Sequence, residues 1–92
     1  MLNTHISRYV ALHRSLGRKF AEQERLLRKF GNYAADHGDS HTRTERIYDW
    51  CRATSSQNTA RTGFAIVRNF SLFAHAEDSA HEFPPAGVFG RG

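Results

Sequence analysis

Hydrophobic residues recur every three or four positions in four segments of the chain, which is the spacing of one buried face of an α-helix. The pattern predicts helices at about residues 3–16, 19–37, 43–54 and 59–76, and segments of strand-like alternation are nearly absent. The stripe of the last segment is broad: Ile66 and Phe73 widen a row formed by Ala60, Phe64, Val67, Phe70 and Ala74. We therefore expect an all-α fold, a four-helix bundle with the last helix packed on more than one side.

Helix ends are marked by residue types with known preferences. Gly17 and Gly38 each stand where a helix C-terminus favours a left-handed residue. Thr42 and Glu45 are spaced as a capping box that would satisfy free amides at the start of the third helix. The periodicity stops beyond Glu77, and the Pro84–Pro85 pair cannot continue a helix. The expected division is a helical domain at residues 1–76 and an extended linker at residues 77–92.

Length and composition narrow the class of protein. A chain of 92 residues with 39% hydrophobic residues suffices for one compact domain. It contains no run of about 18 apolar residues that could span a bilayer, and no secretory signal is evident at the N-terminus. The single cysteine, Cys51, cannot form an internal disulfide, which fits a reducing cytoplasm. We expect no membrane association.

The basic charge belongs to the predicted helical part of the chain. Residues 1–76 hold twelve Lys and Arg side chains against six acidic ones, whereas residues 77–92 hold one against three. Most of these cations are arginines, whose planar fork suits phosphate. Such a balance is typical of an anionic partner, although many basic domains are simply soluble.

Catalytic and metal-binding patterns are lacking. Cys51 shares the apolar face of the third helix and is expected to be a buried core thiol. His37 and His41 are four apart, but Gly38 and a turn separate them, and His75 and His81 straddle a predicted helix end. His13 is expected to be half-buried and hydrogen-bonded. We predict no catalytic residue, no metal site and no cofactor, so the chain by itself is expected to be non-catalytic.

Two helical faces carry candidate contacts to DNA. The second helix gathers cations on an outward flank, which acidic residues interrupt at Glu22 and Glu24: Arg18, Arg25, Arg28 and Lys29. On the fourth helix Arg61 and Arg68 are seven apart and share one side, with the small Ala65 between them. Asn58 adds an amide near the start of that helix. Arginines separated by small residues can approach a groove and contact phosphates or guanine edges; an ordinary solvated face is the alternative.

The order of several motifs resembles the N-terminal core-binding domain of tyrosine recombinases of the phage-integrase type. The stretch YVALHRSLGRKF (9–20) is similar to the first helix and turn of that domain, and LLRKF (26–30) with YAADHG (33–38) to its second helix. AIVRNFSLFA (65–74) resembles the fourth helix, and FPPAGV (83–88) the interdomain linker. The resemblance implies a SAM-like four-helix bundle that forms half of a clamp around duplex DNA. The catalytic domain with its nucleophilic tyrosine would follow this chain, so Tyr9, Tyr33 and Tyr48 are interpreted as packing residues.

The same resemblance implies the DNA contacts and the partners. It places contacts at Arg18 and Lys19 in the turn and at Asn58, Arg61 and Arg68 on the fourth helix; the flank of the second helix adds Arg25. One departure is Gly63, because many relatives carry a basic residue at that position. The implied partners are double-stranded DNA, the catalytic domain of the parent chain and other recombinase protomers, with a monomeric isolated domain in the cytoplasm, associated with the nucleoid.

Two other interpretations stay open. A helix-turn-helix regulator would have a short recognition helix after a tight turn. A helical protein-interaction module would present an exposed apolar patch.

Overall fold

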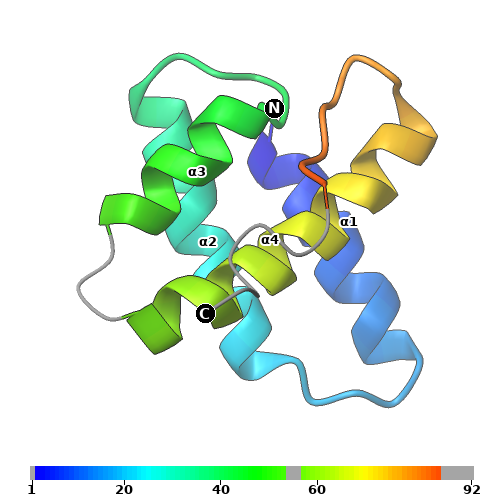
Figure 1. Cartoon of the computed structure of the whole chain (residues 1–92). Helices are drawn as coiled ribbons and strands as arrows, with labels where there is room; N and C mark the ends of the chain where they lie inside the picture. The colour runs from blue at the N-terminus through cyan, green and yellow to red at the C-terminus, as the bar shows by residue number, and fades with distance from the viewer. Residues whose placement is uncertain (1, 54–56, 86–92) are drawn as a thin grey trace.

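The computed structural model describes residues 2–53 and 57–85, which form four helices (Figure 1). These are α1 (Leu2–Ser15), α2 (Ala21–Asp36), α3 (Thr44–Ala53) and α4 (Gln57–Glu77). The all-α fold is confirmed, and each boundary lies within two residues of the predicted one. Parts of two predicted segments, the loop at 54–56 and the end of the linker at 86–92, lie outside the described residues.

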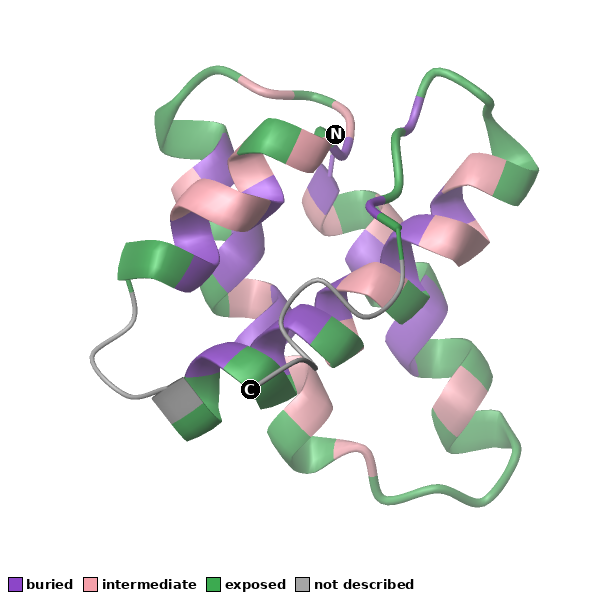
Figure 2. Cartoon of the chain, in the orientation of Figure 1, coloured by how far each residue is buried: buried purple, intermediate pink, exposed green. Residues whose placement is uncertain are grey.

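The α4 helix lies at the centre of the bundle and packs against α1, α2 and α3, as its broad apolar stripe predicts. The helices turn their buried faces toward one another (Figure 2). Fully buried side chains from all four helices form one core, including Ile6, Leu27, Ile47 and Phe70. None of the helices in the described part of the chain is long and apolar enough to cross a membrane.

Cys51 belongs to this core, as expected from its helical spacing. Its side chain is only 1% exposed, and burial raises the pKa of the thiol to about 11. A thiol with such a pKa is almost entirely protonated at neutral pH and is therefore a poor nucleophile.

The turn between α1 and α2 shows why α2 begins later than predicted. Gly17 has φ +84°, the left-handed conformation expected of it. Phe20 also lies in the left-handed region, with φ 58°. Because a left-handed residue cannot belong to a right-handed helix, α2 begins at Ala21 and Lys19 stays in the turn.

The predicted capping box at the start of α3 is wrong. The hydroxyl of Thr42 donates a hydrogen bond of 2.8 Å to the carbonyl of Glu82. The carboxylate of Glu82 accepts the backbone N–H of Thr44 at 2.9 Å and thereby caps the first turn of α3. The acid that caps this helix thus comes from 38 positions further along the chain, where local spacing cannot reveal it.

Residues 78–85, here called the C-terminal strap, fold back onto the bundle. The backbone N–H of Glu82 donates to the carbonyl of Thr42 at 2.9 Å. The side chains of His81 and Pro84 are buried. The linker predicted at residues 77–92 stays a prediction. Within it, the C-terminal strap packs against α3 and α4.

Candidate nucleic-acid interface

The turn between α1 and α2 presents two exposed cations, Arg18 and Lys19. The turn is closed by backbone hydrogen bonds from Gly17 N to Arg14 O and from Arg18 N to His13 O, at 3.0 and 3.2 Å. These bonds satisfy carbonyls at the end of α1 that would otherwise lack partners. The two cations therefore project from a backbone that is held in place.

His13, near the end of α1, contacts two residues of this turn. Its ring stacks on Phe20 with centroids 4.4 Å apart, and its Nδ1 lies 3.3 Å from Nη1 of Arg18. Because a guanidinium can only donate, Nδ1 accepts this hydrogen bond and the imidazole is neutral. Burial and the nearby charge of Arg18 both lower the pKa of His13. The half-buried, hydrogen-bonded state expected for His13 is confirmed.

Two grooves separate the turn and the start of α2 from the outer face of α4. The first is lined by Arg18, Gln23, Ile66 and Asn69, together with Tyr9, His13 and Phe20. The second is lined by Arg25, Asn58 and Thr62, together with Glu22, Leu26 and Thr59. The structure thus brings Asn58, which is distant in sequence, to the edge of the same groove as Arg25, beside the groove that Arg18 lines.

Four polar groove residues were not singled out from the sequence: Gln23, Thr59, Thr62 and Asn69. On α4, the positions Asn58, Thr62, Ile66 and Asn69 follow a three- or four-residue spacing and therefore form one outer stripe along the helix. Asn58 lies four positions before Thr62, and Asn69 lies seven positions after it, so all three side chains lie on the side of α4 opposite its apolar stripe. This spacing was the signal available in the sequence. Amide side chains such as these can form bidentate hydrogen bonds to adenine.

Ion pairing divides the cations of the chain into two groups. Arg25 is held by Glu22 through two hydrogen bonds of 2.8 and 2.6 Å, and Arg28 and Arg14 both pair with Glu24. The cations of the described ranges that have no acidic partner within 4.0 Å are Arg18, Lys19, Lys29, Arg61 and Arg68. Four of these five are predicted DNA contacts, whereas two of the four cations on the predicted flank of α2, Arg25 and Arg28, are neutralised.

Arg61 and Arg68 differ in their surroundings. Arg61 is exposed on α4. Arg68 is half-buried, and its Nε donates a hydrogen bond of 2.8 Å to the carbonyl of Pro84 in the C-terminal strap. Neither residue lines the two grooves, so both flank the outer stripe of α4 instead. Arg68 thus has a structural contact as well as a position on the predicted face.

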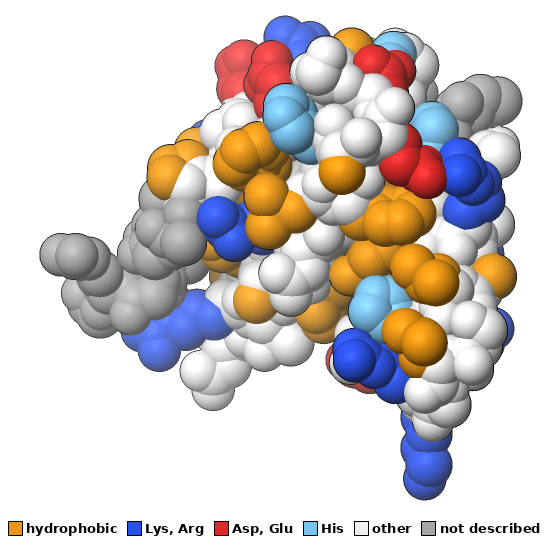
Figure 3. All heavy atoms as spheres, turned by 90° about the vertical axis from the view of Figure 1, so that its right-hand side faces the viewer, with side chains coloured by type: hydrophobic (Ala, Val, Ile, Leu, Met, Phe, Trp, Pro, Cys, Tyr) orange, Lys and Arg blue, Asp and Glu red, His pale blue; other side chains and the backbone are white. Residues whose placement is uncertain are grey.

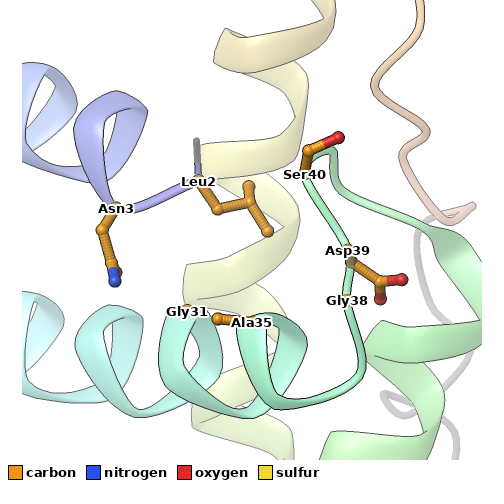
Figure 4. Close-up of a pocket in the computed structure, with 7 residues that line it drawn as sticks. All are labelled: Leu2, Asn3, Gly31, Ala35, Gly38, Asp39 and Ser40. Carbon is orange, nitrogen blue, oxygen red and sulfur yellow. The ribbon is translucent and has the colours of Figure 1, made fainter.

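A third hollow lies away from these cations, at the start of α1 (Figure 4). It is lined by Leu2, Asn3, Gly31, Ala35 and residues 38–40, and most of its surface is apolar. The carboxylate of Asp39 turns away from it and pairs with Arg46 at 2.6 Å. Convergent polar groups of the kind that fix a ligand are not found among the residues that line this hollow.

Comparison with known proteins relates the chain to recombination enzymes. It is 31% identical over 87 residues to a Sinorhizobium fredii protein named "Putative integrase/recombinase y4rB". The similar region covers 90% of this chain and 27% of that protein, so the chain spans about a quarter of the relative's length. No protein-family model matches the sequence, and no solved structure matches it. The similarity supports a relationship to integrase and recombinase proteins.

Proposed function

We propose that this chain binds duplex DNA as the N-terminal clamp domain of a tyrosine recombinase. The face that meets DNA comprises the turn between α1 and α2 and the outer face of α4. Its predicted contacts are Arg18, Lys19, Asn58, Arg61 and Arg68, with Arg25 at its edge. The fragment itself is non-catalytic in this proposal, and its partners in the parent protein are the catalytic domain and neighbouring protomers.

The observation that carries the proposal is the distribution of cations without acidic partners. Arg18 and Lys19 occupy the turn, and Arg61 flanks the outer stripe of α4. Cations that are not neutralised by a neighbouring carboxylate are available to replace counterions on phosphates. The two grooves between them present Gln23, Thr62 and Asn69, whose polar groups suit base edges or sugar–phosphate oxygens.

The test is a titration of the 92-residue chain with a labelled generic duplex at two salt concentrations. If the face neutralises about four phosphates, affinity falls about a hundredfold between about 50 and 200 mM salt. Arg61→Ala should lower the salt slope by about one. Arg52→Ala is the matched control, because Arg52 is an exposed helical arginine that pairs with Asp49 on α3. Salt-independent affinity, or equal losses in both variants, would contradict the proposal.

A second candidate function is that of a protein-interaction module, and one specific observation favours it. Hydrophobic side chains gather on the face where α1 and the C-terminal half of α4 lie (Figure 3). Leu12, Leu16 and Phe83 are the large hydrophobic residues exposed in the described part of the chain, at 45%, 62% and 39%. Absence of duplex binding at low salt would favour this function. The helix-turn-helix interpretation fits poorly, because α4 runs for 21 residues and is too long for a short recognition helix.

A further inference from the structure

Four histidines that are scattered through the sequence meet where α1 begins and α4 ends. The ring of His81, in the C-terminal strap, lies 4.6 Å from the ring of His41 and 5.0 Å from that of His5, measured between centroids. His75 completes the group from α4 by a hydrogen bond between its Nδ1 and the carbonyl of His81. Sequence spacing could not reveal this cluster, because the loop before α3 and the strap after α4 approach each other only in the fold.

Three side chains of this region place one ligand atom each within 4.8 Å of the others: His41, Asp78 and His81. The Nε2 of His41 lies 3.2 Å from Oδ2 of Asp78. In a tetrahedral zinc site with bonds of about 2.0–2.2 Å, neighbouring ligand atoms are about 3.4 Å apart. The first pair is already close to this separation, and a ligand atom of His81 up to 4.8 Å away needs to approach by up to about 1.4 Å.

His81 supplies a second and independent observation. The residue is 0% exposed, and its Nε2 has no hydrogen-bond partner among the described residues. A buried ring nitrogen without a partner is unusual, since buried polar groups are nearly always hydrogen-bonded. The nitrogen belongs to the ring that lies next to His41, and the buried Nδ1 of His5, whose ring meets that of His81 edge-on, also lacks a partner within the described part of the chain.

We propose that His41, Asp78 and His81 form a binding site for a divalent transition-metal ion of the zinc type. Two imidazole nitrogens and one carboxylate oxygen are ligands that Zn²⁺ accepts readily, whereas Mg²⁺ and Ca²⁺ prefer sites made of oxygen. The site departs from the sequence expectation of no metal. It does not depend on DNA binding, since none of its residues lies on the face proposed for DNA.

Two of the three ligands are already oriented by neighbours. Ser40 Oγ lies 3.0 Å from Nδ1 of His41, so it can accept the Nδ1 proton and leave the Nε2 lone pair for the metal. The backbone N–H of Ala80 donates to Oδ1 of Asp78 at 3.0 Å, which leaves Oδ2 facing His41. Hydrogen bonds of this kind, behind the ligands, are usual in metal sites.

The third ligand needs a tautomer change. His81 Nδ1 now accepts the backbone N–H of Thr42 at 3.0 Å, so the neutral ring carries its proton on Nε2. When a metal takes the Nε2 lone pair, the Nε2 proton is replaced by one on Nδ1, which Thr42 Oγ1 at 3.4 Å can accept. Because two N–H donors cannot face each other at 3.0 Å, the ring of His81 must then move away from the backbone N–H of Thr42. The exchange conserves the number of protons on the ring and breaks the hydrogen bond from the backbone N–H of Thr42 to Nδ1 of His81.

Bound metal would join the C-terminal strap to the loop before α3. Asp78 and His81 belong to the strap, and His41 belongs to the loop that also holds Thr42. The site would therefore have a structural role, fastening the segment that leads toward the C-terminus. Since the folded state alone brings the three ligands together, binding should raise the melting temperature of the chain.

The experiment uses the 92-residue chain, freed of metal by a chelator and titrated with Zn²⁺ in a calorimeter and with Co²⁺ by visible spectroscopy. We expect one ion per chain, a higher melting temperature with Zn²⁺, a ligand-field spectrum with Co²⁺ and no effect of Mg²⁺. His41→Ala and Asp78→Asn should each weaken Zn²⁺ binding at least tenfold. Both residues are partly exposed, so these variants should still fold, whereas replacing the fully buried His81 could unfold the chain.

His37→Ala is the matched control, because His37 is an exposed histidine that lies outside the cluster and hydrogen-bonds to Tyr33 O. It should bind Zn²⁺ as the wild-type chain does. The proposal is overturned if the folded wild-type chain shows neither heat nor a shift in melting temperature with millimolar Zn²⁺. It is equally overturned if the His41→Ala and Asp78→Asn variants bind Zn²⁺ as tightly as the wild-type chain.

Discussion

The indole of Trp50 lies directly against the backbone of Gly63, so that the two helices α3 and α4 touch at this point. A Cβ atom at position 63 would lie 2.9 Å from Cζ3 and 3.0 Å from Cη2 of the ring. Trp50 is itself buried and packs edge-on against Phe30, with ring centroids 5.6 Å apart. The glycine is therefore explained by close packing, and a basic side chain at this position would face the core instead of DNA.

We expect Gly63→Ala to destabilise the chain even though alanine favours helices. The helix gains about 1 kcal/mol from the replacement of glycine, whereas overpacking against a rigid ring costs about 1–3 kcal/mol. The expected net loss of unfolding free energy is about 1 kcal/mol, measured by urea denaturation. In the Trp50→Phe background the same substitution should cost less, since the smaller ring relieves the contact. Equal costs in both backgrounds would show that the Trp50 ring is not the obstacle.

The ion pair between Glu22 and Arg25 predicts that duplex affinity can be raised. Glu22 accepts two hydrogen bonds from Arg25, which lower the pKa of Glu22 and keep it charged at neutral pH. Glu22→Gln removes a negative charge from the second groove and leaves Arg25 to interact with phosphates. We expect severalfold tighter binding at low salt and a steeper salt slope, measured with the labelled duplex.

Glu45→Gln is the control for this increase, because Glu45 is an exposed glutamate on α3, away from the two grooves. It removes the same charge from the chain without altering the proposed face. If both variants gained the same affinity, the effect would be one of net charge, and the position of Glu22 beside Arg25 would not matter.

Substitutions of Arg61 and Arg68 are predicted to differ in their effect on the unfolding free energy, although both should weaken duplex binding. Arg61→Ala should weaken duplex binding and change the unfolding free energy by less than about 0.5 kcal/mol, as is usual at exposed positions. Arg68→Ala also removes the hydrogen bond to Pro84 and should cost about 1 kcal/mol or more. Thermal denaturation together with duplex titration measures the two effects. An Arg68→Ala chain as stable as the wild-type chain would show that the strap contact contributes little.

Local patterns predicted the helices well, because each helix buries its own apolar stripe and ends at a residue with a strong local preference, such as Gly17. They failed where the start or the cap of a helix depends on a residue outside that helix. Phe20 combines a left-handed conformation with a ring stacked on His13, and α2 therefore begins only at Ala21. The cap of α3 comes from Glu82, far away in sequence.

The candidate DNA face could be predicted only in part for a related reason. Helical spacing singles out Arg18 and Arg61, whereas Lys19 follows only from the family resemblance; all three are exposed. The pairing that neutralises Arg25 depends on side-chain rotamers, which the residue pattern leaves open, although Glu22 lies only three positions away. The contribution of Asn69 to the first groove depends on how α4 packs beside the turn. Both are tertiary properties.

The environment of His13 predicts a specific pH dependence. Burial and the charge of Arg18 lower its pKa below the ordinary value of 6.5. Because the pKa is lower in the folded chain than in the unfolded chain, the unfolded chain binds more protons just below pH 6.5. The contribution of His13 to stability is therefore complete above pH 6.5 and is lost as the pH falls from there through the folded pKa.

An NMR titration of the histidine ring protons measures this shift directly. In Arg18→Gln the pKa of His13 should rise toward 6.5 but stay below it, because burial is the larger cause and remains. Lys19→Gln removes a neighbouring charge that has no part in the lowered pKa and serves as the control. A His13 pKa that did not move in Arg18→Gln would mean that the contact between the two side chains is absent in solution.

The cap on α3 predicts that the C-terminal strap stabilises the bundle. Glu82 Oε1 accepts the N–H of Thr44, and the backbone of Glu82 is paired with Thr42. Loss of a helix cap costs about 0.5–2 kcal/mol, so Glu82→Ala should lower the unfolding free energy by about 1 kcal/mol. Glu45→Ala, at the site of the capping box that the sequence suggested, should change it by less than about 0.5 kcal/mol. Urea denaturation of the two variants compares the caps, and a larger loss in Glu45→Ala would show that α3 is capped locally and that the strap is not needed for this helix to begin.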